Sequence, residues 1–253
     1  MNIDFTLRTY IELLQAFMQT GYSFSTFETF IRDPLPNTVI LRHDVDAKPG
    51  NSLAFAKIQY EMGIQGVYYF RAVPASWNEP VIRAIADMGH EIGYHYECLT
   101  TCRGNFNQAI QDFDRNLTAL RRLVPVSTIC MHGSPQSKFD SKDLWKMYAY
   151  RDFGIIGEPY FDIDFATVAY LTDTGRRWDG HKVSVRDKVN SAFKYPYTST
   201  YDLIAGLRDQ QLPNQLMVTF HPQRWNDGLY PWTQEFVSQN VKNIIKRYFF
   251  VTK

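Results

Sequence analysis

The sequence has few cysteines, almost no net charge and no long apolar run, and each absence narrows what the chain can be. Three cysteines among 253 residues are an odd number, which argues against a disulfide framework and for a reducing compartment, so we expect a cytoplasmic protein. A formal net charge of +1 supplies no overall field for nucleic acid or an anionic membrane. No apolar run approaches the roughly 20 residues that cross a bilayer. We therefore expect neither nucleic-acid binding nor a membrane span.

The chain also lacks repeats, low-complexity tracts and a linker rich in glycine and serine. Its hydrophobic content of 45% and charged content of 21% are ordinary for a globular protein. A length of 253 residues fits one α/β barrel or one open α/β sheet. We therefore expect a single domain over residues 1–253, in which residues 1–37 form an N-terminal helix and turn extension.

Hydrophobic periodicity predicts strands that alternate with helices, an order typical of βαβ units and a parallel sheet. In the first half we expect helices over 6–19, 52–62, 78–88 and 105–123, and strands over 38–45, 66–72, 90–95 and 127–132. In the less regular second half we expect strands over 153–157, 168–173, 182–185 and 216–221, and helices over 140–152, 199–210 and 232–248.

Four of the six histidines fall at the ends of predicted strands, and carboxylates lie beside them. The strand ends are His43-Asp44-Val45-Asp46, His95-Tyr96-Glu97, His132-Gly133 and Phe220-His221. In parallel α/β folds the active site lies where the carboxyl ends of the strands converge. The pattern therefore indicates a shared metal or acid/base site.

Asp44 and Asp46 are two residues apart, so on a continuing strand both side chains project to one face and His43 projects to the other. Two carboxylates held together favour a division of roles, in which one binds a cation and the other acts as a base. A cation held by carboxylate and imidazole matches zinc or a similar first-row metal. The alternative is that the two aspartates cap the helix that begins near Ser52.

Three segments, RHDVD at 42–46, GHEIGYH at 89–95 and TFH at 219–221, resemble the signature motifs of the NodB-like polysaccharide deacetylases, carbohydrate esterase family 4. Allantoinase-like amidohydrolytic enzymes are relatives in the same superfamily. The resemblance runs from Val39 to His221 and is strongest in GHEIGYH. It implies a distorted (β/α)7-type barrel and an enzyme that removes acetyl groups from N-acetylated sugars at an Asp-His-His metal site.

Matched motif by motif, the resemblance implies a role for each of four residues. Asp44 would be the general base and His221 the acid that protonates the leaving amine. Asp46 and His95 would be the first two metal ligands, and the cofactor would be a divalent ion, with zinc expected.

Two departures from the family pattern change the expected site. The family has a further ligand histidine four residues after the first, and Leu99 occupies that position here. We expect His132 to complete the ligand set, with Glu97 as the second candidate, or else a site without metal. The family arginine that positions the base is also absent from the segment around His132, and Arg42, Arg71 or Arg177 could replace it.

A rival metal site would use the cysteines, because Cys98, Cys102 and Cys130 lie near His95 and His132 in the expected topology. Their spacing is irregular, and a cysteine can equally be a plain buried residue.

The segment TDTGRRWDGH, 172–181, follows a predicted strand and combines two arginines with a tryptophan. Arginine forks match phosphates and carboxylates, and tryptophan stacks on sugar rings. We therefore expect Arg176, Arg177 and Trp178, together with Glu97, to bind substrate. The alternative is a solvated loop held by an Arg-Asp pair and a tryptophan anchor.

The expected function is hydrolysis of an N-acyl group from a sugar or nucleotide-sugar, within surface-polysaccharide or lipopolysaccharide biosynthesis. That setting rests on the family resemblance alone. Two alternatives stay open: an amidohydrolase for a small non-sugar amide, and a carbohydrate-binding barrel without catalysis.

Overall fold

A parallel sheet forms the centre of the computed structural model, which describes residues 3–134, 137–179 and 189–246. Its strands are β1 (Ser23–Ser25), β2 (Thr38–Val45), β3 (Val67–Phe70), β4 (Glu91–Tyr96), β5 (Ile129–Met131), β6 (Ala169–Thr172) and β7 (Gln215–Phe220). The order is β5-β4-β3-β2-β7-β6, and β1 pairs with β2. Every pair is parallel. The sheet is a half-barrel, which confirms the expected distorted (β/α) barrel in an open form.

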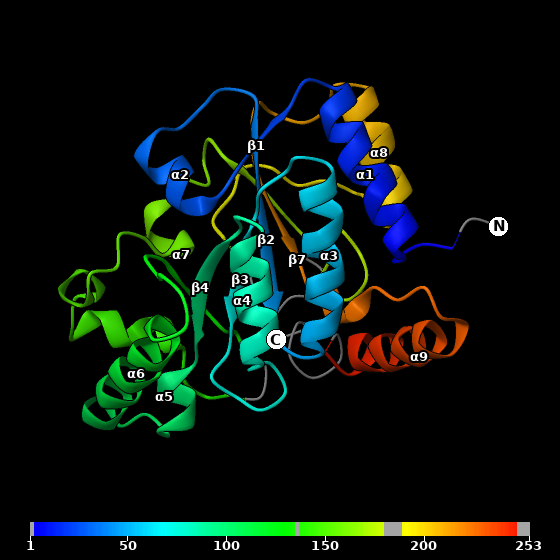
Figure 1. The fold of residues 1–253 in the computed structure, drawn as a ribbon. Helices are drawn as coiled ribbons and strands as arrows, with labels where there is room; N and C mark the ends of the chain where they lie inside the picture. Colours follow the sequence, from blue (N-terminus) through cyan, green and yellow to red (C-terminus); the bar gives the residue numbers. More distant parts are fainter. Residues whose placement is uncertain (1–2, 135–136, 180–188, 247–253) are drawn as a thin grey trace.

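Helices pack around this sheet (Figure 1). They are α1 (Leu7–Gln19), α2 (Phe27–Arg32), α3 (Pro49–Glu61), α4 (Glu79–Asp87), α5 (Cys98–Thr101), α6 (Phe106–Arg121), α7 (Pro159–Asp162), α8 (Thr200–Arg208) and α9 (Leu229–Lys246). Figure 1 shows α3 and α4 in front of the strands and α1 beside α8. Among the described residues, none of these helices is both long and apolar enough to span a bilayer.

The second half departs from the expected elements in two places. The helix expected over 140–152 is two short 3-10 helices, η1 (Ser141–Lys146) and η2 (Tyr150–Phe153). The rings of Trp145 and Phe153 pack against Phe113 of α6, so tertiary contacts override the local helical pattern. The strand expected over 153–157 is reduced to a bridge between Gly157 and Thr128, and the strand expected over 182–185 lies outside the described residues.

The two faces of the sheet carry different chemistry. On β2 the side chains of Leu41 and Val45 join a large hydrophobic core under the helices. Ile40, on the other face, belongs to a smaller apolar cluster inside the half-barrel, and Arg42 and Asp44 share that inner face because side chains alternate along a strand. The inner face therefore changes from apolar to charged toward the carboxyl ends of the strands.

Gly93 in the GHEIGYH segment has a steric role on this inner face. A Cβ atom at Gly93 would overlap the ring of Tyr69 on the neighbouring strand β3. Because only glycine leaves this space, the Tyr69 ring can lie over Gly93, with its centroid 6.3 Å from that of His95.

His43 lies on the outer face, as its position in the strand predicts. Its Nδ1 donates to the Val67 carbonyl at 3.0 Å, its Nε2 lies 3.2 Å from the Tyr10 hydroxyl and 3.1 Å from Gln59 Nε2, and burial lowers its pKa to about 3. It is a neutral core histidine. Its hydrogen bonds connect the strand to α1 and α3 and do not reach the aspartates.

Candidate metal and catalytic site

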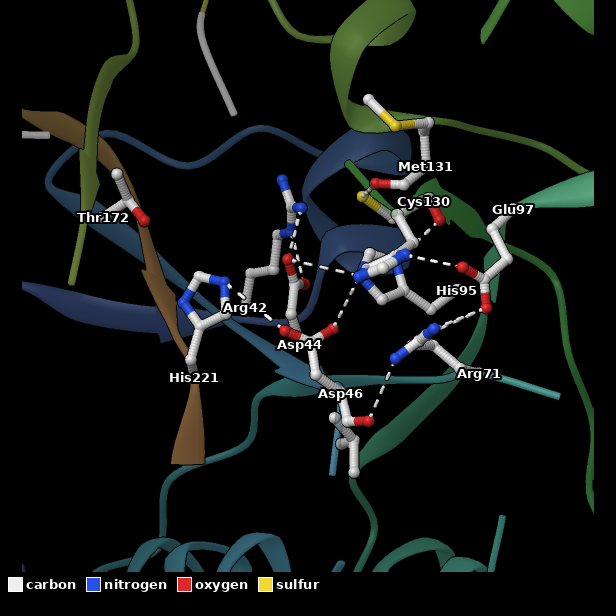
Figure 2. A network of polar contacts seen from close by, with 12 residues as sticks. Arg42, Asp44, Asp46, Arg71, His95, Glu97, Cys130, Met131, Thr172 and His221 are labelled. Atoms are coloured by element: carbon white, nitrogen blue, oxygen red, sulfur yellow. Dashed lines mark hydrogen bonds and ion pairs between the residues drawn. The ribbon is translucent and has the colours of Figure 1, made fainter. Parts of the chain in front are cut away.

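The carboxyl ends of β2, β4, β5 and β7 bring Asp44, Asp46, His95, His132 and His221 together. Asp46 Oδ1 lies 3.6 Å from His95 Nε2 and 3.5 Å from His132 Nε2. Its Oδ2 lies 4.0 Å from His221 Nε2, and Asp44 Oδ2 lies 3.6 Å from His95 Nε2. Figure 2 shows the two aspartates between His221 on one side and His95 on the other. Neither aspartate caps the next helix, because the N-cap of α3 is Lys48.

Asp46 has one satisfied and one unsatisfied carboxylate oxygen. Oδ2 accepts a hydrogen bond from Gln223 Nε2 at 3.1 Å. Oδ1 is buried and has no hydrogen-bond partner among the described residues. Burial raises the pKa of Asp46, but His132, His221 and His95 outweigh it and the pKa is lowered. An ionised oxygen therefore faces two imidazole nitrogens without a proton donor of ordinary hydrogen-bond length.

The tautomer of His95 follows from its partner on the other side of the ring. Its Nδ1 lies 2.8 Å from the Cys130 carbonyl oxygen, which can only accept, so Nδ1 carries the proton. Burial holds the pKa of His95 well below its usual value, and the ring is neutral. Its Nε2 therefore presents a lone pair toward Asp46 and Asp44.

His132 is oriented in the same way by a carboxylate. Its Nδ1 lies 2.9 Å from Glu97 Oε2, and Glu97 is ionised because His132 and Arg71 outweigh its burial and lower its pKa to about 2. The Nδ1–H group therefore donates to Glu97, and Nε2 faces Asp46. Burial lowers the pKa of His132, yet Asp46 and Glu97 outweigh it and the pKa is raised.

Asp44 forms a buried fork with Arg42 of the same strand. Arg42 Nε donates to Oδ1 at 2.8 Å and Nη2 donates to Oδ2 at 2.7 Å, and both side chains are at most 5% exposed. Among the three arginines considered from the sequence, Arg42 is thus the one that holds Asp44. Arg71 pairs with Glu97 and Arg177 pairs with Asp179.

Asp173, which follows β6, is a site residue that the sequence reasoning missed. Its Oδ1 accepts from His221 Nδ1 at 2.6 Å and from Arg224 Nη1 at 3.0 Å. Its Oδ2 accepts from the Trp225 indole at 2.8 Å and from the His221 backbone N–H at 2.9 Å. His221 and Arg224 outweigh burial and lower the pKa of Asp173 to about 2. His221 is consequently fixed with Nε2 toward Asp46.

Leu99, in the position of the family's third ligand, is turned away from this site. It lies on α5, is 1% exposed and belongs to the hydrophobic core. The nearby imidazole is instead that of His132, whose backbone N–H donates to the Tyr96 carbonyl at 2.9 Å.

The three cysteines, all of which the structure describes, form no disulfide, and only Cys130 belongs to a possible ligand group with an aspartate. Cys130, Asp44 and His95 can each offer a ligand atom within 4.8 Å of the others, so a second donor set shares His95 with the first. Asp44 in this set is already engaged by the Arg42 guanidinium, whose positive charge opposes a second cation. Cys98 contacts Tyr94, and burial raises the pKa of its thiol.

Two of the three residues expected to bind substrate in the segment 176–178 are buried. Trp178 is 2% exposed, and its indole N–H donates to Thr200 at 3.1 Å, so no ring face is open to a sugar. The Arg176 guanidinium is buried over Phe5 and Trp232. This burial fits the alternative of a tryptophan anchor with an Arg-Asp pair, and the expected role of these two residues in substrate binding stays a prediction. Arg177 pairs with Asp179 at 2.8 Å and keeps 39% of its side chain exposed.

Two of the three distances in this donor set suit a divalent cation. Two ligands each about 2.0–2.1 Å from zinc at the tetrahedral angle are about 3.3 Å apart, and Asp46 Oδ1 lies 3.6 Å and 3.5 Å from the two imidazole nitrogens. Among the described residues, only the set of Asp44, His95 and Cys130 has all its ligand atoms within 4.8 Å of one another, so an ion held by Asp46 would require the rings of His95 and His132 to move toward each other. Each imidazole has an anchored Nδ1, as ligating histidines usually do. The Asp44 carboxylate, held by Arg42, and the His221 imidazole, held by Asp173, flank this set, so two groups capable of proton transfer lie on either side of it.

Comparisons with protein-family models and with curated proteins find no match to this chain. Among solved structures, it is similar to a family 4 carbohydrate esterase (CE4) pseudoenzyme from Bacillus anthracis, at 14% identity and a TM-score of 0.45, over 84% of this chain and 62% of that chain. It therefore spans less than two thirds of that protein's length.

Two further similar structures are named family 4 carbohydrate esterases. For the family 4 carbohydrate esterase from Streptomyces lividans, identity is 14% and the TM-score 0.42, over 82% of this chain and 86% of that one. For Bacillus subtilis PdaA, a family 4 carbohydrate esterase, identity is 12% and the TM-score 0.45, over 91% of this chain and 84% of that one.

Proposed function

We propose that the chain is a metal-dependent deacetylase that hydrolyses the N-acyl group of a sugar. The observation that carries this proposal is Asp46 Oδ1, a buried oxygen without a hydrogen-bond partner among the described residues that faces His95 Nε2 and His132 Nε2. A cluster of lone pairs of this kind is stabilised by a cation. The flanking Asp44 and His221 supply the two proton-transfer groups that amide hydrolysis needs.

Asp46, His95 and His132 would hold the metal ion, and zinc is the ion we propose. A zinc ion held there lowers the pKa of water and polarises a carbonyl group. The overlapping set with Cys130 is disfavoured, because its carboxylate already receives both N–H groups of the Arg42 fork.

The chain's own residues divide the proton transfers. Asp44 accepts a proton from the water whose oxygen attacks the amide carbonyl carbon, and Arg42 keeps its carboxylate oriented during that step. For this step His221 is an imidazolium ion, and it donates its Nε2 proton to the amine nitrogen as the carbon–nitrogen bond breaks. The proton that Asp44 took from water returns to His221 Nε2 through solvent before the next turnover. Asp173 holds Nδ1–H of His221, which keeps the imidazole in the required orientation. The products are the carboxylic acid and the free amino sugar.

The substrate in this proposal is an N-acylated sugar or nucleotide-sugar, and the exposed Arg177 is the segment's remaining candidate for a contact with it. We further propose a role in surface-polysaccharide biosynthesis, lipopolysaccharide included, in the cytoplasm. The motif resemblance supports the role, and the lack of a disulfide among the three cysteines, all of which the structure describes, supports the compartment.

The test measures carboxylate release from N-acetylated amino sugars, their nucleotide-linked forms and small non-sugar amides, with zinc supplied. Asp44→Asn should retain zinc and lose about 10²–10⁴-fold in turnover, because the base is removed and the ligands are kept. Asp46→Ala should lose both zinc and turnover.

Two results would contradict the proposal. Hydrolysis of the small amides alone would favour the amidohydrolase. Zinc-loaded protein that binds sugars without releasing acid would favour the carbohydrate-binding barrel.

A further inference from the structure

Four residues that occupy equivalent places on neighbouring strands form one line of polar contacts. Asp46, Arg71, Glu97 and His132 are each the first residue after a strand, namely β2, β3, β4 and β5. These strands are adjacent in the sheet and parallel. Four successive strand ends thus present an anion, a cation, an anion and an imidazole side by side.

The two oxygens of Glu97 have separate partners in this line. Oε2 accepts from His132 Nδ1 at 2.9 Å. Oε1 accepts from Arg71 Nε at 3.0 Å and Nη2 at 2.7 Å. Glu97 is 14% exposed and Arg71 19% exposed in their side chains, so solvent screens the pair only weakly. Because both oxygens already accept hydrogen bonds from Arg71 and His132, Glu97 orients the imidazole and has no carboxylate oxygen left without a partner for the ion.

Arg71 also fixes the other end of the line. Its Nη1 donates to the Asp46 backbone carbonyl at 3.3 Å. Its backbone N–H donates to Ser76 Oγ at 3.0 Å, and the Ser76 hydroxyl donates to the Val45 carbonyl. One side chain therefore ties the backbone that carries Asp46 to the carboxylate that orients His132 (Figure 2).

We propose that Arg71 and Glu97 are a positioning pair that makes His132 the third metal ligand of this chain, in place of the residue at position 99. This inference rests on the proposed metal site. Glu97 accepts Nδ1–H and thereby leaves the Nε2 lone pair aimed at Asp46 Oδ1, 3.5 Å away. Arg71 holds the Glu97 carboxylate in that position, and its hydrogen bond to the Asp46 carbonyl fixes the backbone from which the Asp46 side chain reaches His132. Such partners of ligand histidines are commonly worth 10–100-fold in metal affinity.

The first measurement is zinc affinity, determined by competition with a chelator of known affinity. Glu97→Ala should weaken zinc binding about 10–100-fold, whereas Glu97→Gln keeps an acceptor oxygen and should recover most of that loss. Arg71→Gln leaves the Glu97–His132 contact and should give an intermediate loss, and it serves as the second variant if Glu97→Ala does not fold. Asp112→Ala is the matched control, because Asp112 is a similarly covered carboxylate paired with Arg115 on α6, and it should bind zinc as the wild type does.

The second measurement is the tautomer of His132 in the metal-free protein, read from the ¹⁵N shifts and couplings of its ring at one fixed pH at which the ring is neutral. The wild type and Glu97→Gln should carry the proton on Nδ1, and Glu97→Ala should show a mixture of tautomers. A change in general stability would not produce this signature.

The outcomes separate this inference from the proposed function. Unchanged zinc affinity in folded Glu97→Ala and Arg71→Gln, or an unchanged tautomer in Glu97→Ala, would overturn the positioning pair even if the wild type hydrolyses N-acyl sugars. Glu97-dependent zinc binding in a protein that hydrolyses no amide would support the pair and contradict the proposed function. If the wild type binds no zinc, the pair is overturned as a device for metal binding.

Discussion

At the scale of single residues, the position of one proton on each imidazole determines what the site can bind. A backbone carbonyl fixes Nδ1–H of His95 and a carboxylate fixes Nδ1–H of His132, and both Nε2 atoms face Asp46. His221 has a third partner, Asp173. The protein thus uses a different acceptor for each ring and directs all three Nε2 atoms toward one carboxylate.

Asp173 gives a prediction at this scale. The Asp173 carboxylate accepts hydrogen bonds from His221, Arg224 and Trp225. In Asp173→Asn the amide NH₂ group, which can only donate, replaces one of the accepting oxygens, so the hydrogen bonds to that oxygen are lost. We expect turnover to fall about 10²–10⁴-fold while zinc affinity stays near the wild-type value, because the metal ligands are untouched. Steady-state kinetics and zinc titration of the same preparation check this, and a loss of zinc together with turnover would contradict it.

Strand ends in the sequence were sufficient to find Asp44, Asp46, His95, His132 and His221, because parallel strands bring their carboxyl ends together. Two further signals were present and were not used. Asp173 ends a predicted strand in the same way, and Arg42 lies two residues before Asp44 on the same strand face. The burial of Trp178 could not be predicted, because it depends on packing against Phe220 and Trp225, which are distant in the sequence.

At the scale of elements, a short helix after β4 determines which side chains reach the proposed metal site. The four-residue helix α5 begins directly after Glu97 and turns Leu99 into the core. A histidine at position 99 would therefore enter an apolar environment and would not approach Asp46. The third imidazole reaches the site from the next strand, β5, instead.

Leu99→His tests this placement. We expect the free energy of unfolding to fall by about 1–3 kcal/mol, because a polar ring is buried without a partner, and zinc affinity to stay unchanged. Leu99→Met is the matched control and should cost less than about 1.5 kcal/mol. Denaturant unfolding and zinc titration are the measurements, and tighter zinc binding by Leu99→His without loss of stability would show that the position does reach the site.

The regular first half of the chain was largely predictable from periodicity. The strand expected over 38–45 has the bounds of β2, and the helix expected over 6–19 is α1. The three-residue strand β1 and the short helices α2 and α5 were missed, because they are too short to show a period. The helix expected over 140–152 was wrong because aromatic contacts with α6 determine the backbone there.

At the scale of the whole molecule, buried ionisable groups make stability depend on pH in opposite directions. His43 has its pKa lowered by burial to about 3, so between about pH 6.5 and 3 the unfolded chain binds a proton that the folded protein does not, and stability is lost as the pH falls. Burial raises the pKa of Glu91 and of Glu158 to about 7. Their contribution is present at low pH and is lost as the pH rises from about 4.5 to 7.

We expect the contribution of His43 to appear as a pH-dependent difference in the free energy of unfolding between the wild type and His43→Asn. In metal-free protein, the stability advantage of the wild type over His43→Asn should shrink by about 3 kcal/mol between pH 7 and pH 4. Denaturant unfolding at both pH values measures it. An advantage that is independent of pH would mean that His43 is not a neutral core residue, whereas Glu91 and Glu158 act equally in both proteins and cancel.

The central claim is that Asp46, His95 and His132 hold a divalent ion. Anomalous diffraction at the zinc edge, from crystals grown with zinc, tests it most directly. We predict one strong peak about 2.0–2.1 Å from Asp46 Oδ1, His95 Nε2 and His132 Nε2, and its loss in His132→Ala. A peak bounded by Asp44, His95 and Cys130, or no peak at this end of the half-barrel, would contradict the account.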